Sequence, residues 1–198
     1  EFNNMTKFVF CFFDLSCTPE FLKSWVNLCH YLNHKGIQYL VTQGSSCNAF
    51  YAKQMCLGGN VLAGPKQNPF QGRLKYEQLV FLSGSISFSV GDFINIINKS
   101  NNLGLSFISA KVKNRFKTAN KFINNIAIVE HTEFDMTIIR RGVLEKLTYP
   151  WFKPHVSKSK KDTNFVDIDI CKRIREEAMI DLYVYDDINI KRKTISYE

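Results

Sequence analysis

The side chains best suited to bind an anion are concentrated in one part of this 198-residue sequence. Residues 111–161 contain twelve basic and four acidic side chains, and this excess equals the formal net charge of +8 of the whole chain. Such an excess suits a nucleic acid, a membrane surface or a phosphorylated small molecule. A solvated surface would explain the same charges without a ligand, so the charge pattern leaves both interpretations open.

The residue types that commonly bind metals or act as nucleophiles show no matching spacing. The six cysteines include no Cys-x-x-Cys pair, and the four histidines share no metal-ligand spacing. The serines that follow Gly44 lack the Gly-x-Ser-x-Gly pattern, and the glycines at 58 and 59 lack the Lys-Ser ending of a phosphate-binding loop. We therefore predict no metal cofactor and no serine or cysteine nucleophile.

The composition predicts a folded protein. With 45% hydrophobic residues and 17 phenylalanines, the chain has enough apolar material for a core. We find no secretory signal peptide and no apolar run of about eighteen residues that would span a bilayer. We expect one domain over residues 5–198, with residues 1–4 a remnant outside the fold, in a cytoplasmic protein with reduced thiols.

The first forty residues have the pattern strand, helix, strand. Residues 7–13 are an uninterrupted apolar run, as in a strand buried on both faces, and residues 37–42 are a second strand. Thr18 and Pro19 are typical of a helix start and Gly36 of a helix end. The side chains that this helix is expected to bury lie at helical spacing: Leu22, Trp25, Cys29 and Leu32.

The same patterns predict the remaining elements. A short helix over residues 47–57, capped by Ser46, is followed by a long loop over residues 58–72. Further strands are expected at residues 78–82, 86–90, 105–110, 126–130, 136–140 and 182–185, and helices at 92–98, 142–147 and 167–178. A mobile basic loop is expected at residues 155–162. The predicted fold class is α/β, with a mixed, mostly parallel central sheet flanked by helices.

Three stretches resemble segments of a known family. Residues 75–93 are similar to a Tyr-Asp-x-x-Leu-x-x-Asp-x-Asp-Ile-x-Phe segment, residues 136–152 to a strand and helix that end in a Tyr-Pro-Trp-Phe turn, and residues 167–187 to a Glu-Asp-x-x-x-Cys helix with its following strand. These segments occur in the GT-A-type glycosyltransferases, especially the viral and phage-like members. The resemblance implies a GT-A-like, Rossmann-like fold that binds a nucleotide sugar and transfers the sugar to a hydroxyl acceptor such as a glycan. For a viral member, the expected location is the host cytoplasm.

The chain departs from this family at three chemical positions. The Asp-x-Asp turn, which holds a divalent metal against the donor diphosphate, reads Ser83-Gly84-Ser85 here. The Glu-Asp pair reads Val166-Asp167, and the family's late histidine falls near Arg192. The resemblance therefore implies a transferase without the usual metal site.

The resemblance also implies a set of site residues. The nucleotide would lie across the carboxyl ends of the early strands, which carry Phe12, Asp14, Thr42 and Gly44, and the sugar would face Ser83, Gly84 and Ser85. The cations that would replace the metal are Lys111, Lys113, Arg115 and Arg192. Asp167 would act as general base or cap its helix, and Trp151 would stack on the sugar or belong to the core.

Two alternatives to an active transferase stay open. The three simultaneous departures favour a catalytically inactive GT-A-like module with a binding or structural role. A nucleic-acid-binding domain ranks last, because the basic residues show no recognised DNA or RNA motif. The sequence does not predict the donor, the acceptor, the stereochemistry or the oligomeric state.

Overall fold

The computed structural model describes residues 5–111, 123–154 and 167–192. Its strands are β1 (Thr6–Phe12), β2 (Tyr39–Gln43), β3 (Tyr76–Leu82), β4 (Ile86–Ser87), β5 (Phe107–Ala110), β6 (Ile126–Val129), β7 (Met136–Arg140), β8 (Leu182–Tyr185) and β9 (Lys191–Arg192). Its α-helices are α1 (Pro19–His34), α2 (Ala49–Cys56), α3 (Val90–Asn102) and α4 (Ile168–Glu176). Short 3₁₀ turns occur at Val61–Ala63, Pro69–Gly72 and Leu144–Lys146.

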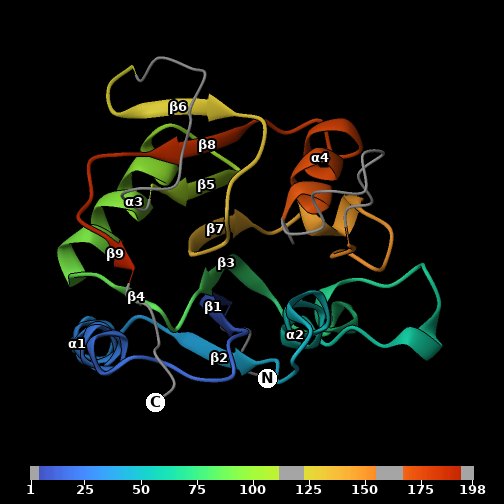
Figure 1. The fold of residues 1–198 in the computed structure, drawn as a ribbon, viewed down its shortest axis with the longest axis horizontal. Coiled ribbons are helices and arrows are strands. Elements are labelled where there is room, and N and C mark those ends of the chain that lie inside the picture. The colour runs from blue at the N-terminus through green and yellow to red at the C-terminus, as the bar shows by residue number, and fades with distance from the viewer. Residues whose placement is uncertain (1–4, 112–122, 155–166, 193–198) are drawn as a thin grey trace.

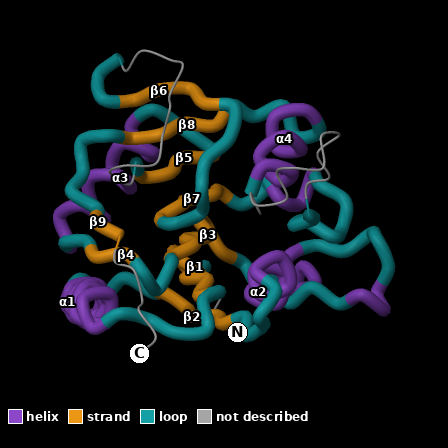
Figure 2. The backbone as a smooth tube through the Cα atoms, viewed as in Figure 1, coloured by secondary structure: helices purple, strands orange, loops and turns teal. Residues whose placement is uncertain are grey.

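Seven of the strands form one mixed sheet in the order β2-β1-β3-β7-β5-β8-β6. Strands β2, β1, β3, β5 and β8 run in one direction, and β7 and β6 run in the other. Helices α1 and α3 lie on one face of the sheet and α2 and α4 on the other, while β4 and β9 form a small separate sheet (Figure 1, Figure 2). The predicted α/β, Rossmann-like fold class is therefore confirmed.

Helix α1 begins and ends where the sequence predicts. The Thr18 hydroxyl accepts a hydrogen bond from the Phe21 N–H at 3.1 Å, and Gly36 follows the helix with a φ of +64°. The expected burial of Leu22 is wrong, because its side chain is 53% exposed. The face turned to the sheet instead carries Phe21 and Leu28, which lie two turns apart on the helix.

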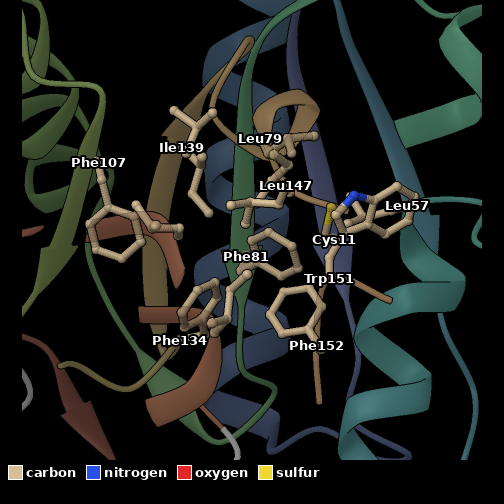
Figure 3. Packing of buried hydrophobic residues seen from close by; sticks show 14 of the residues in the cluster. Cys11, Leu57, Leu79, Phe81, Phe107, Phe134, Ile139, Leu147, Trp151 and Phe152 are labelled. Atoms are coloured by element: carbon tan, nitrogen blue, oxygen red, sulfur yellow. The ribbon is translucent and has the colours of Figure 1, made fainter. Parts of the chain in front are cut away.

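Aromatic rings fill the core on the face covered by α2 and α4. The rings of Phe81, Phe134 and Phe152 meet edge to face, with centroids 5.2 to 5.6 Å apart (Figure 3). Trp151 belongs to the same cluster and is fully buried. A separate cluster that includes Phe10 and Phe93 fills the space under α1 and α3.

Several predicted boundaries differ from the structure. The helix expected over residues 142–147 is a single 3₁₀ turn, and the strand expected over residues 86–90 stops at Ser87. It stops there because Ser89 and Asp92 form a capping box that starts α3. Helix α2 is capped by Asn48 rather than by Ser46. The loop predicted at residues 155–162 lies outside the described residues.

Candidate functional site

The Ser83-Gly84-Ser85 turn directly follows β3 and is bound to the residues that follow β1. The Asp14 carboxylate accepts hydrogen bonds from the Ser83 hydroxyl at 2.7 Å and from the Gly84 N–H at 2.6 Å. A Cβ atom on Gly84 would lie 2.5 Å from the Ser16 carbonyl oxygen, so this close approach requires glycine. Since β1 and β3 are parallel, Asp14 and the turn meet at the carboxyl edge of the sheet.

Arg192 brings a permanent positive charge to this turn. Its strand β9 pairs with β4, which begins one residue after Ser85. The Arg192 Nε donates to the Ser85 hydroxyl at 3.1 Å, and one Nη donates to Glu133 at 2.9 Å. The other Nη lies 3.5 Å from an Asp135 carboxylate oxygen. The turn, Asp14 and Arg192, which are far apart in sequence, therefore form one cluster.

The segment Glu133–Asp135 joins this cluster to a second charged group. While its two carboxylates contact Arg192, the Asp135 carbonyl accepts a hydrogen bond from the Ser83 N–H at 2.8 Å. Its middle residue, Phe134, donates its backbone N–H to the Asp167 carboxylate at 3.2 Å. These four contacts connect Asp167, through the segment Glu133–Asp135, to the turn and to Arg192.

Asp167 forms an ion pair with Lys53, a residue of α2. The Asp167 side chain is 13% exposed. Asp167 is the N-cap residue of α4, as one of the two interpretations expected, but its side chain makes no capping hydrogen bond to that helix. The Lys53 side chain is only 3% exposed, and its ammonium lies 4.6 Å from the ring centroid of Phe13 and 5.0 Å from that of Phe134. Aromatic rings and one carboxylate therefore surround this buried cation.

Three predicted nucleotide-binding residues contact other parts of the protein. The Gly44 N–H donates to the Phe12 carbonyl at 2.8 Å, and a Cβ atom on Gly44 would lie 1.8 Å from the Ala52 carbonyl oxygen. The Thr42 hydroxyl donates to the backbone of β1 at 3.3 Å. The Phe12 ring packs against Trp25 of α1 with a centroid distance of 4.9 Å. Helix α2 thus packs against the side of Gly44 where a Cβ would lie, and nucleotide contact at these three residues stays a prediction.

The remaining predicted residues lie apart from the cluster or outside the described residues. Lys111 forms a 2.7 Å ion pair with Asp186. Trp151 is fully buried, so the interpretation as a sugar-stacking residue is wrong and the core alternative holds. Lys113 and Arg115 lie outside the described residues.

Sequence reasoning missed Lys53 and the two carboxylates that contact Arg192. Lys53 lies beside apolar positions of a short helix, and its neighbours Ala52 and Cys56 are also buried. A lysine among the apolar positions of a short helix was therefore the sequence signal for a buried cation. Glu133 and Asp135 carried no signal of their own, because they fall within the basic stretch and flank a buried phenylalanine.

Over residues 5–111, 123–154 and 167–192, no group of three or more His, Cys, Asp or Glu side chains is arranged to hold a metal ion. A hollow of about 660 Å³, lined by residues that include Asn33 and Tyr39, lies beside the amino end of β2. It is therefore at the opposite edge of the sheet from the Ser83-Gly84-Ser85 turn. Within the described part of the chain, no helix has the length and apolar character needed to cross a membrane.

Comparison with known proteins adds information about the fold alone. No protein-family model matches the chain, and no curated protein matches it. Among solved structures, the crystal structure of A197 from STIV is similar, with a TM-score of 0.59 and 14% sequence identity. The similarity covers 96% of this chain and 86% of A197. At this identity the likeness shows a shared fold and leaves the activity open.

Proposed function

We propose that this protein binds a nucleotide sugar at the carboxyl edge of β1 and β3 and transfers the sugar to a hydroxyl acceptor without a divalent metal. The observation that carries this proposal is the hydrogen bond of Arg192 to the Ser83-Gly84-Ser85 turn. By the sequence resemblance, this turn would correspond to the metal-binding turn of GT-A-type glycosyltransferases. A guanidinium has a fixed charge and a planar set of donors that match phosphate oxygens. Arg192 would therefore stabilise the leaving diphosphate where the family uses a metal ion.

Asp167 supplies the second part of the proposed mechanism. A general base must accept the proton of the acceptor hydroxyl as that oxygen attacks the sugar. Asp167 is held by Lys53 and the Phe134 N–H but keeps part of its surface exposed. We expect Asp167→Asn to abolish turnover while leaving nucleotide-sugar binding intact, measured well below the thermal midpoint of the variant. Unchanged turnover in this variant would contradict the role of Asp167.

A catalytically inactive binding module is the second candidate, and one observation favours it. Three carboxylates lie in the cluster, those of Asp14, Glu133 and Asp135, against the single guanidinium of Arg192. This local excess of negative charge opposes the approach of a diphosphate. A protein that retains the fold without turning over a donor would be compatible with such a cluster.

The thermal midpoint, measured with a panel of nucleotides and nucleotide sugars, tests the proposed function. Each ligand is tested with Mn²⁺ and with EDTA, and a ligand at about a hundred times its Kd stabilises the folded state by about 2.7 kcal/mol. We expect one nucleotide sugar to raise the midpoint equally in EDTA and in Mn²⁺. A rise only in Mn²⁺ would contradict the metal-free site, and no rise with any ligand would favour the inactive module.

A further inference from the structure

One edge of the molecule is built from a stretch of sequence without acidic residues. Between Glu20 and Glu77 the chain contains six cationic side chains and no aspartate or glutamate. One of the six, Lys53, is buried against Asp167, and the other five are exposed: Lys23, Lys35, Lys66, Arg73 and Lys75. Most of this stretch forms α1, β2, α2 and the segment after α2, which lie along one edge of the fold (Figure 1). Glu20, in the first turn of α1, is an exposed acidic residue beside this stretch. The five exposed cations outnumber it, so the edge has a net positive charge.

The same edge exposes aliphatic side chains. We call it the β2 edge surface and define its apolar part by four residues that are each 43% to 56% exposed: Leu22, Val26, Leu40 and Val41. On α1, Leu22, Trp25 and Val26 share one stripe because they lie three and four positions apart. The Trp25 ring lies 6.2 Å from the ring of Tyr39 in β2, so this stripe borders the strand. Aliphatic side chains of two elements thus adjoin one another in solvent.

Strand β2 carries none of the features that commonly protect a sheet edge. It is the last strand at its end of the sheet among the described residues, and its sequence Tyr39–Gln43 contains no charged residue and no proline. Exposed edges of soluble proteins are usually blocked by lysine, proline or a bulge. Val41 lies on the same face of β2 as Tyr39, toward α1, whereas Leu40 points to the opposite face, because successive side chains of a strand alternate. Exposed aliphatic side chains grouped in this way, on both sides of an unprotected edge, typically mark a place of interaction.

The charge and the apolar side chains together select the partner. A nucleic acid would pair with the cations but would leave the four aliphatic side chains without apolar contacts. A second copy of the chain would bring two positively charged edges together, and like charges repel. An anionic bilayer satisfies both features, since its headgroups attract lysine and arginine and its upper acyl region accepts aliphatic side chains.

We propose that the β2 edge surface docks on an anionic phospholipid bilayer. The depth is limited, because the backbone groups at the free edge of β2 need water and therefore remain at the level of the headgroups. Lys23 on α1 and Lys35 at the C-cap of that helix contact phosphate groups, while Leu22, Val26 and Val41 reach the boundary of the acyl chains.

The segment after α2 provides a second apolar contact. Leu62 is 94% exposed, and its backbone N–H donates to the Asn60 side chain at 2.9 Å. The Gln67 side chain in turn donates to the Asn60 carbonyl at 2.8 Å, so the turn that presents Leu62 is fixed by its own hydrogen bonds. Lys66 lies four residues after Leu62 in the sequence. This turn therefore combines an aliphatic and a cationic side chain, as the β2 edge surface does.

Sedimentation of the full chain with phospholipid vesicles tests this proposal. We expect binding to phosphatidylcholine vesicles that contain about one third phosphatidylglycerol and not to pure phosphatidylcholine, with about tenfold weaker binding when salt rises from about 0.05 M to 0.5 M. The double variants Leu22→Ser/Val26→Ser and Leu40→Ser/Val41→Ser should each weaken binding about tenfold. Lys23→Glu/Lys35→Glu should weaken it by at least about tenfold.

Matched variants elsewhere on the molecule separate this surface from general charge and apolarity. Leu103→Ser/Met179→Ser replaces exposed apolar residues outside the edge, and Lys172→Glu/Lys191→Glu removes exposed cations outside it, so both should bind within about twofold of the original chain. Thermal midpoints check that each variant is folded. Absence of binding to anionic vesicles, or equal losses in edge and control variants, would overturn the proposal. So would a dimer, detected by analytical ultracentrifugation, that Leu40→Ser/Val41→Ser dissociates.

Discussion

At the scale of single residues, the ion pair between Lys53 and Asp167 has unequal partners. Lys53 is almost completely buried and touches aromatic rings, while Asp167 is partly exposed and also accepts the Phe134 N–H. A buried charge that loses its partner destabilises a protein by about 3 to 5 kcal/mol. The loss should therefore depend on which residue is replaced.

We expect Asp167→Asn to lower the free energy of unfolding by about 3 kcal/mol, because it leaves the Lys53 ammonium buried without a counter-charge. Lys53→Met should cost less, about 1 to 2 kcal/mol, because solvent and the Phe134 N–H still stabilise the carboxylate. The double variant should be more stable than Asp167→Asn alone. Urea unfolding of all four proteins measures these differences, and additive effects of the two substitutions would contradict the assigned pair.

The sequence alone predicted some of these residues and not others, for physical reasons. The resemblance to a family suggested Asp167 and Arg192, and the structure connects both to the Ser83-Gly84-Ser85 turn through the segment Glu133–Asp135. It also suggested Gly44 and Trp151, whose surroundings are filled by other parts of the chain. Residue type and spacing do not reveal whether the space beside a residue is occupied. That information depends on how distant elements pack.

At the scale of elements, helix α2 packs closely against Gly44, the residue that follows β2. Because a Cβ on Gly44 would lie 1.8 Å from the Ala52 carbonyl oxygen, any side chain there must push α2 away from the sheet. We expect Gly44→Ala to destabilise the protein by about 2 kcal/mol or more. Gly91→Ala, in α3, is the matched control. A Cβ on Gly91 would lie 3.5 Å from its nearest neighbour, the Ser89 hydroxyl oxygen, which is an ordinary van der Waals contact.

The control should leave the stability unchanged or raise it by up to about 1 kcal/mol, because alanine favours the helix more than glycine does. Thermal unfolding of Gly44→Ala, Gly91→Ala and the original chain measures these differences in stability. Equal stability of Gly44→Ala and the original chain would contradict the close packing of α2.

The sequence predicted most elements because their signals are local. Thr18 and Gly36 mark the ends of α1, and the apolar runs of β1 and β3 need no knowledge of their neighbours. Strand β9 was missed because it is two residues long and becomes a strand only through its pairing with β4. The order of strands in the sheet was equally out of reach, since β7 lies between β3 and β5 through contacts distant in sequence.

At the scale of the whole molecule, the fold separates five of the six cysteines into exposed and buried thiols, while Cys29 is half-buried. Cys17 and Cys47 are exposed, whereas Cys11, Cys56 and Cys171 are buried. Burial raises the pKa of Cys56 to about 12 and that of Cys171 to about 12, and burial also raises the pKa of Cys11. The three buried thiols therefore stay protonated near pH 8, and the thiolate is the reactive form.

We expect a maleimide to modify Cys17 and Cys47 within the first minutes at pH 8 and to reach the three buried cysteines only after urea is added. Mass spectrometry of the digested protein identifies each modified position. Rapid modification of Cys56 or Cys171 in the folded protein would contradict the packing of α2 and α4 against the sheet.

Calorimetric titration in EDTA tests the proposal that Arg192 takes the place of a metal ion in binding a nucleotide sugar. The titration uses the nucleotide sugar that raises the thermal midpoint most, with the original chain, Arg192→Met and the matched control Lys191→Met on the same strand. We expect at least about tenfold weaker binding, or about 1.4 kcal/mol, for Arg192→Met and a change within about twofold for Lys191→Met. Equal affinity of Arg192→Met and the original chain, or binding that requires Mn²⁺, would contradict this role of Arg192.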